Sequence, residues 1–227
     1  MNAWRELVQR IRAVIFDLDG TLTPVHSVWQ YIHERLGTWE NQGLKSLQAF
    51  LEGRITYQEF ADRDVWAWKG VARCTLERIV SEIPLRPGSE RTTATLKAAG
   101  LKLAILSSGL DLLANPVGQK LGMDLCLANG LGFSNDILDG TVQIRVPWHG
   151  KPDRLPMICQ TLGVEPSEVA VVGDGAGDAP LFPMVGLGVA FNASPDVEAM
   201  AHVSVRSTDL RTLIPLLSGQ ERDEKVG

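Results

Sequence analysis

Four groups of polar residues stand where side chains and backbone could together hold a charged ligand. They are residues 17–21 (DLDGT), residues 107–109 (SSG), Lys151 in the stretch HGKPD, and residues 173–178 (GDGAGD). Carboxylates of the first and last groups could share a hard cation such as Mg²⁺. The hydroxyl, backbone N–H groups and lysine between them could hold a phosphate. In this order the groups indicate metal-assisted phosphoryl transfer with an aspartate nucleophile.

Each group also has a structural interpretation when it is taken alone. Asp17 and Asp19 project to the same side of an extended chain, but an Asp-Gly pair is also a common turn with solvated acids. Residues 107–109 could be an ordinary turn before a helix, Lys151 a surface lysine, and Asp178 an N-cap. These interpretations explain the combination poorly, because all four groups occur at predicted strand ends of one chain.

The elements that must position these groups show two patterns. Short apolar runs predict strands over 13–16, 101–106, 124–128, 169–172, 187–191 and 203–205, and helical segments lie between most of them. Residues 131–146 suggest a β-hairpin that turns near Asp139-Gly140. Strands that alternate with helices favour a parallel sheet with right-handed crossovers. Such sheets bind ligands beyond the carboxyl ends of their strands.

A different pattern interrupts this alternation. Apolar spacing predicts helices over 28–36, 44–52, 56–68 and 75–83, with no strand between them. Another helix is predicted over 2–11. We therefore expect an α/β fold: a Rossmann-like core of five or six mainly parallel strands over 1–23 and 87–227, with a small all-helical cap over 24–86.

Composition excludes several classes of protein. The chain has 227 residues, of which 44% are hydrophobic and 22% charged, as in ordinary globular proteins. No apolar run approaches the roughly 18–20 residues that span a bilayer, and the first residues lack the apolar stretch of a secretory signal. A net charge of −5 without a basic run argues against nucleic acid and membrane partners. Three scattered cysteines favour the cytoplasm, and a homodimer is left open.

The four groups resemble the motifs of the haloacid dehalogenase superfamily of phosphohydrolases, and most of all its phosphoserine phosphatase branch. The resemblance runs from about residue 13 to about residue 200. It covers DxDxT at 17–21, the serine at Ser107, the lysine at Lys151 and GDxxxD at 173–178. The long interval between the first two motifs is similar to that of members with a helical cap. The short interval between Ser107 and Lys151 leaves no room for a large α/β cap.

The resemblance implies a catalytic role for each matched residue. Asp17 attacks phosphorus and becomes an aspartyl-phosphate, and Asp19 protonates the leaving alkoxide and later activates water. Ser107, Gly109 and Lys151 hold the phosphoryl oxygens.

The resemblance also implies Mg²⁺ as cofactor. The residues that it places at the metal are Asp17 and Asp174 through their carboxylates, Asp19 through its backbone carbonyl, and Asp178, which orients Lys151 or metal-bound water. Mg²⁺ and Lys151 together would reduce the repulsion between an anionic nucleophile and a phosphate dianion.

The match is incomplete where this branch usually binds its substrate. A glutamate usually follows the first motif and an arginine lies in the cap, whereas the aligned residues here are His26 and Asp62, with Arg63 beside the latter. Trp66 and Trp68 are two apart on a predicted helix and cannot share one face. We expect one in the cap core, and we assign Trp66 to the substrate side. The expected partner is thus a small phosphorylated metabolite, without phosphoserine being assigned.

Two alternative functions are compatible with the same motifs. A phosphotransferase would pass the aspartyl-phosphate to an alcohol instead of water. A binding protein of the same fold would catalyse nothing, but the intact Asp17, Asp19, Lys151 and Asp174 argue against it.

Overall fold

The computed structural model describes residue 6 and residues 8–218. The helix predicted over 2–11 lies partly outside the described residues, and its part over 8–10 is helical. No helix of the described residues has the length and apolar character needed to cross a membrane.

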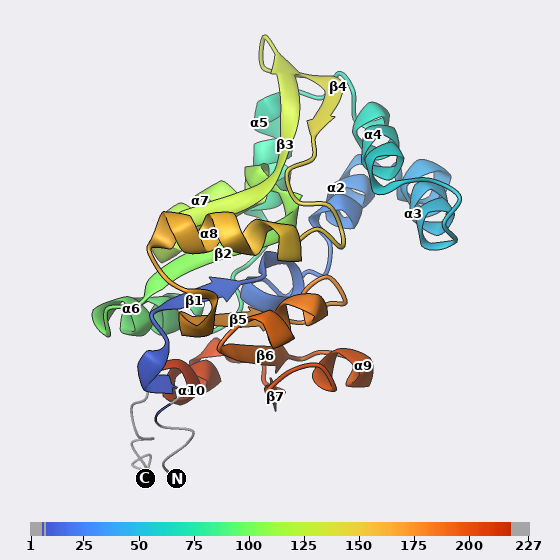
Figure 1. Ribbon diagram of the computed structural model, residues 1–227. Coiled ribbons are helices and arrows are strands. Elements are labelled where there is room, and N and C mark those ends of the chain that lie inside the picture. The colour runs from blue at the N-terminus through green and yellow to red at the C-terminus, as the bar shows by residue number, and fades with distance from the viewer. Residues whose placement is uncertain (1–5, 7, 219–227) are drawn as a thin grey trace.

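One seven-stranded sheet forms the centre of the described chain, with the strand order β4-β3-β2-β1-β5-β6-β7 (Figure 1). The strands are β1 (Ala13–Phe16), β2 (Lys102–Leu110), β3 (Leu125–Ser134), β4 (Ile137–Gln143), β5 (Val169–Gly173), β6 (Leu187–Phe191) and β7 (Val203–Val205). Neighbouring strands are parallel except β3 and β4, which are antiparallel. The predicted α/β class is confirmed. The prediction of five or six strands was too low, because β4 extends the sheet through a hairpin.

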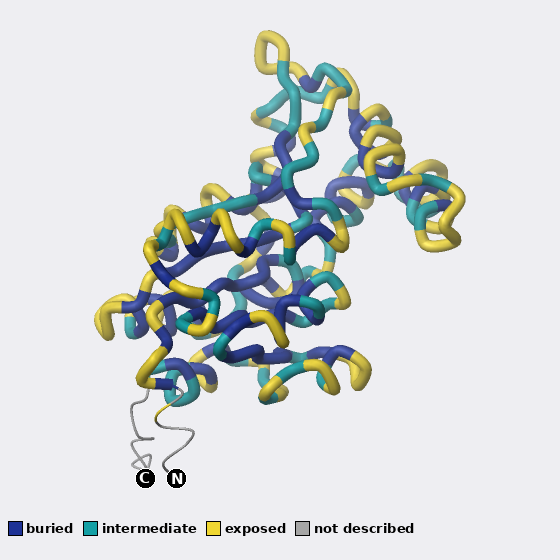
Figure 2. Tube along the Cα trace, in the orientation of Figure 1, coloured by how far each residue is buried: buried dark blue, intermediate teal, exposed yellow. Residues whose placement is uncertain are grey.

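Helices cover both faces of this sheet. In β1, Val14 and Phe16 enter the hydrophobic core on one face and Ala13 and Ile15 the core on the other. The first core includes residues of α6 (Ser89–Ala98), α7 (Asp111–Leu121) and α10 (Ile214–Ser218). The second includes residues of α8 (Leu155–Leu162) and α9 (Pro195–Glu198). Figure 2 shows the central strands buried between these layers, which holds the strand ends in fixed positions.

The segment between β1 and α6 is helical. It contains α2 (Val28–Leu36), α3 (Leu44–Leu51), α4 (Tyr57–Ala67) and α5 (Arg73–Ser81), and α2, α3 and α4 stand beside one end of the sheet (Figure 1). Thr56 and Glu59 form the predicted capping box of α4. These helices lie within residues 24–86, the segment that we propose as the cap.

A buried aromatic and polar cluster joins the cap helices. Trp68 is fully buried, and its ring stacks on Trp29 with centroids 5.8 Å apart. Its Nε1–H donates to His33 Nδ1 at 3.2 Å, and His33 Nε2 lies 3.3 Å from Asp64 Oδ1. Trp68 is therefore the tryptophan of the pair that packs in the cap core.

The hairpin of β3 and β4 turns earlier than predicted. Asn135 and Asp136 occupy the turn with φ of 50° and 60°, values that these two residue types tolerate better than most. Asp139, expected in the turn, instead lies in β4 and accepts hydrogen bonds from Thr141. The strand β4 packs against α4, so the hairpin supports the cap segment from the side of the sheet.

Candidate active site

The register of the sheet brings the sequence motifs to one edge. Phe16 of β1 pairs with Ile105 of β2 and with Val172 of β5, so the residues that follow these three positions lie at the same level of the sheet. Asp17 N–H still donates to Val172 O at 2.9 Å. The four motif groups then line one cavity of about 220 Å³.

The first motif forms a tight loop that brings backbone close to the fourth. Gly20 has φ of +83°, and a Cβ there would lie 2.1 Å from Asp174 Oδ2, so the position requires glycine. Thr21 Oγ1 donates to Asp174 Oδ1 at 2.9 Å. Asp19 Oδ2 accepts a hydrogen bond at 2.9 Å from the backbone N–H of Val28, which is the first residue of α2. The loop therefore connects the acids of the first motif to the beginning of the cap segment.

Lys151 joins the first motif to the last. Its Nζ lies 2.8 Å from Asp17 Oδ1 and 2.7 Å from Asp178 Oδ1, and all three side chains are buried or nearly so. Burial lowers the pKa of Lys151, but the two carboxylates outweigh this effect and raise it above the ordinary value. The lysine is therefore fully charged at neutral pH, and its surface interpretation is wrong.

The carboxylates around Lys151 outnumber its single positive charge. Oxygens of Asp17, Asp174 and Asp178 lie within 4.8 Å of one another. Burial and then the Asp178 carboxylate raise the pKa of both Asp17 and Asp174. Hard oxygen donors in such a group suit a divalent cation, which would remove this repulsion. These residues therefore fit the divalent metal of the family resemblance, while ligation by the Asp19 carbonyl stays a prediction.

Asp19 has the properties of a general acid. Its Oδ1 is buried and has no hydrogen-bond partner, although the residue lines the cavity. Burial raises the pKa of Asp19 to about 6, against the hydrogen bond from Val28, which lowers it. A carboxyl group with a pKa near neutrality can both give and take a proton during turnover.

The second motif lies in an irregular end of β2 and not in the predicted turn. The strand continues to Leu110, and its pairing with β3 shifts between Leu106 and Leu110. Gly109 N–H donates to Ser107 Oγ at 2.9 Å, and a Cβ on Gly109 would lie 3.0 Å from Asp19 Oδ2. Ser107 and Gly109 thus line the cavity beside Asp19, as the resemblance implies for phosphate-binding residues.

The backbone carbonyl of Ser108 connects the cap segment with the core. It accepts hydrogen bonds from Tyr57 Oη at 2.7 Å, Trp29 Nε1 at 3.1 Å and Asn129 Nδ2 at 2.9 Å. Trp29 and Tyr57 belong to α2 and α4, whereas Asn129 belongs to β3. Sequence analysis missed Tyr57 and Asn129, because neither stands in a motif and a backbone acceptor gives no signal in the sequence.

The residues predicted to contact substrate divide into two groups. His26 lines the cavity, and its Nδ1 lies 3.5 Å from Asp174 Oδ2. Asp62, Arg63 and Trp66 line a separate groove between α4 and β4, so their placement at the substrate is corrected. Trp66 is 64% exposed. The physical reason is helical periodicity, since the face of α4 that carries Tyr57 and Phe60 lines the cavity.

Arg86, between α5 and α6, is a third residue that sequence analysis missed. Its guanidinium donates to the backbone carbonyls of Gly20, Thr21 and Thr23, at 2.7 Å for Thr21 and 3.3 Å for Thr23. One side chain therefore ties the chain that leaves the cap segment to the loop that enters it.

We expect Arg86→Met to destabilise the protein by about 2 kcal/mol, because it leaves several backbone acceptors without their charged donor. Urea denaturation followed by circular dichroism measures the free energy of unfolding. Arg91→Met on α6 is the matched control, since Arg91 is exposed and should change stability by less than about 0.5 kcal/mol. Equal stability of the two variants would contradict the assigned role of Arg86.

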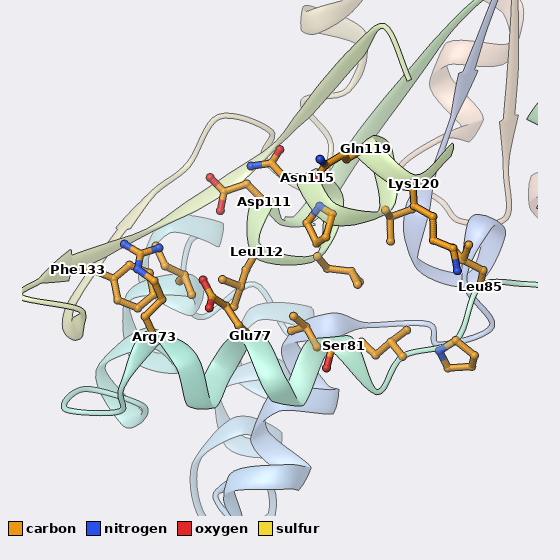
Figure 3. Close-up of a pocket in the computed structure, with 17 residues that line it drawn as sticks. Arg73, Glu77, Ser81, Leu85, Asp111, Leu112, Asn115, Gln119, Lys120 and Phe133 are labelled. Atoms are coloured by element: carbon orange, nitrogen blue, oxygen red, sulfur yellow. The ribbon is translucent and has the colours of Figure 1, made fainter. Parts of the chain in front are cut away.

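A larger cavity of about 760 Å³ lies between α5, α7 and β3. Figure 3 shows Arg73 and Glu77 of α5 near Leu112 of α7 and Phe133 of β3. Three of its four charged lining side chains are paired with residues outside the cavity: Arg73 with Asp136, Lys120 with Glu90, and Asp111 with Arg145. It contains none of the motif residues, so cavity volume alone does not identify the active site.

Comparison with known proteins identifies the family of the chain. The chain belongs to the haloacid dehalogenase-like hydrolase family, which matches residues 11–186. It is 30% identical over 214 residues to a phosphoserine phosphatase of Idiomarina loihiensis, covering 94% of this chain and 96% of that protein. It is 32% identical over 213 residues to a phosphoserine phosphatase of Albidiferax ferrireducens, covering 90% and 89% of the two chains.

Solved structures show the same similarity. The structure of a phospho-aspartyl intermediate analogue of phosphoserine phosphatase has a TM-score of 0.77 and 28% identity, covering 90% of this chain and 97% of that one. A substrate-bound phosphoserine phosphatase complex has a TM-score of 0.78. The predictions of this family, its fold and a phosphatase are therefore confirmed.

Proposed function

We propose that the protein hydrolyses a small phosphorylated metabolite, with Asp17 as nucleophile and Mg²⁺ as the divalent cation. The observation that carries this proposal is the position of Asp17. Its carboxylate is bound by Lys151 at 2.8 Å and lies within 4.8 Å of Asp174 and Asp178, inside one cavity. A cytoplasmic location and a homodimer stay predictions of the sequence.

Asp19 carries out both proton transfers that the reaction needs. Asp17 attacks phosphorus while the bond to the alcohol oxygen breaks, and Asp19 gives its proton to that oxygen. Asp19 then accepts a proton from the water that attacks the aspartyl-phosphate and releases inorganic phosphate. Lys151 and the backbone near Ser107 and Gly109 hold the phosphoryl oxygens.

The group of three carboxylates, Asp17, Asp174 and Asp178, makes the activity dependent on a metal. When bound at Asp17 and Asp174, Mg²⁺ would supply positive charge that lets an anionic nucleophile approach a phosphate dianion. The proposed metal is Mg²⁺ because its preferred ligands are carboxylate and carbonyl oxygens.

Removal of metal tests this function directly. We expect the protein to release inorganic phosphate from p-nitrophenyl phosphate in Mg²⁺, to lose this activity in EDTA, and to regain it when Mg²⁺ is restored. The melting temperature should also rise with Mg²⁺ concentration, because a ligand that binds only the folded state stabilises it. Undiminished activity in EDTA would contradict the proposal. Added alcohol that becomes phosphorylated would instead identify a phosphotransferase.

A further inference from the structure

The active-site cavity has aromatic walls above the catalytic residues. The aromatic residues that line it are Trp29, Trp39, Tyr57, Phe60 and Trp148. Trp29 and Tyr57 pack against Phe60 with ring centroids 6.0 and 5.8 Å away. The first four come from the cap segment and Trp148 from the core. A leaving group attached to a phosphate at Asp17 would therefore be surrounded by ring faces and edges.

Trp29, Tyr57 and Gln30 already use polar atoms of these walls in hydrogen bonds within the protein. Trp29 Nε1 and Tyr57 Oη both donate to Ser108 O. Gln30, which also lines the cavity, donates through Nε2 to Glu34 at 2.8 Å. These donors are therefore not open to a substrate, and the side chains offer it mainly apolar surface.

Charged side chains of the cavity are those of the catalytic machinery and its neighbour His26. The acidic, basic and histidine lining residues among those described are Asp17, Asp19, Asp174, Asp178, Lys151 and His26. Lys151 is paired with two carboxylates, and His26 lies beside Asp174. No arginine or glutamate lines the cavity in the described part of the chain.

A charged leaving group would therefore be poorly accommodated. A carboxylate would find no free cation, and burial of an unpaired charge is strongly unfavourable. An ammonium group would have to compete with the metal and Lys151 for the catalytic acids. Arg63, which could have met a carboxylate, lies in the other groove.

The size of the cavity limits the leaving group further. Its volume of about 220 Å³ is below the roughly 300–1,000 Å³ of sites for drug-sized ligands. After the phosphoryl group is placed, the remaining space suits a single small ring. Edge-to-face and offset contacts with the surrounding aromatic side chains would stabilise such a ring.

We propose that the substrate is the phosphate monoester of a small, uncharged aromatic alcohol. This inference rests on the proposed function and narrows its substrate class. Hydrolysis breaks the bond between phosphorus and the alcohol oxygen, and that oxygen takes the proton of Asp19 and leaves as a neutral alcohol.

The wild-type protein tests the inference without any substitution. In Mg²⁺, kcat/KM is measured for benzyl phosphate, methyl phosphate, O-phosphoserine and phosphocholine, four alkyl phosphates that differ in the group beyond the reacting bond. We expect benzyl phosphate to exceed each of the others by about 10-fold or more. Equal or faster turnover of O-phosphoserine or phosphocholine would overturn the inference.

A matched pair of tryptophan variants locates the preference. Trp148→Ala should lower the ratio of kcat/KM for benzyl phosphate to that for methyl phosphate by about 10-fold, because it removes one aromatic wall. Trp66→Ala should leave the ratio unchanged, since Trp66 lies outside the cavity. Thermal melting checks that both variants fold. Loss of selectivity in Trp66→Ala alone would place the aromatic contact elsewhere and contradict the assignment.

The outcomes separate the inference from the proposed function. If neither p-nitrophenyl phosphate nor any of the four esters is hydrolysed, the proposed function fails, and the substrate class falls with it. If p-nitrophenyl phosphate is hydrolysed and O-phosphoserine or phosphocholine is preferred, only the substrate class is wrong.

Discussion

Asp17→Asn is expected to lower kcat for p-nitrophenyl phosphate by at least about 10⁴-fold while the protein keeps its fold. The amide nearly matches the size of the carboxylate, and its oxygen can still accept the hydrogen bond that Leu18 N–H donates to Asp17 Oδ1 at 2.7 Å. It cannot attack phosphorus as a carboxylate does. The pKa of Asp17 is raised by burial and by Asp178, so loss of its charge also reduces repulsion inside the site. We therefore expect a melting temperature close to that of the wild type.

The control for this substitution is Asp153→Asn, which makes the same chemical change at an exposed position after Lys151. It should retain full activity. Mass spectrometry of protein quenched in acid during turnover gives a second readout, because a phosphorylated protein should accumulate in the wild type and be absent in Asp17→Asn. Retention of most activity by a folded Asp17→Asn variant would remove Asp17 from the role of nucleophile.

Local patterns in the sequence predicted most of the strands of the sheet and the motif residues that follow them. The apolar run 13–16 predicted β1 because a strand buried on both faces must be apolar at every position. The structure then pairs β1 with β5, which brings Asp17 and Asp174 together at the ends of neighbouring strands. The sequence therefore predicted which residues follow strand ends, whereas their meeting at one edge depends on the order of the strands.

Contacts made between separate elements could not be predicted in this way. The acceptor for Tyr57 is a backbone carbonyl of Ser108, and Arg86 binds carbonyls of Gly20, Thr21 and Thr23. Every residue has a backbone carbonyl, so the type of the accepting residue does not reveal the contact in the sequence. The position of Trp66 depended on the rotation of α4 relative to the core, which hydrophobic periodicity fixes only for the buried face. The aromatic cavity is therefore a finding of the tertiary structure.

Lys151→Met is expected to have the second large effect on activity and stability, because it removes the buried cation that lies between two acids. Asp17 and Asp178 each lie within 2.8 Å of its Nζ. Removing one partner from a buried ion pair typically destabilises a protein by about 3–5 kcal/mol, since an uncompensated charge stays behind. We expect a loss of this size in EDTA. In Mg²⁺, kcat/KM should fall by about 10²–10³-fold, as for other lost charge-stabilising donors.

Three further variants distinguish this effect from the loss of any lysine. Lys120→Met removes a pair with Glu90 in which both side chains are more than half exposed, and such pairs contribute about 0–1 kcal/mol. In Lys151→Met/Asp178→Asn, one of the repelling acids is neutral, so the stability loss should be smaller than the sum of the two single losses. Unfolding in EDTA is measured for the wild type, Lys120→Met, Lys151→Met, Asp178→Asn and the double variant. Equal losses for Lys151→Met and Lys120→Met would show that charge balance does not hold the site together, whereas a non-additive cycle would show that Lys151 stabilises the fold through the same acids that it positions for catalysis.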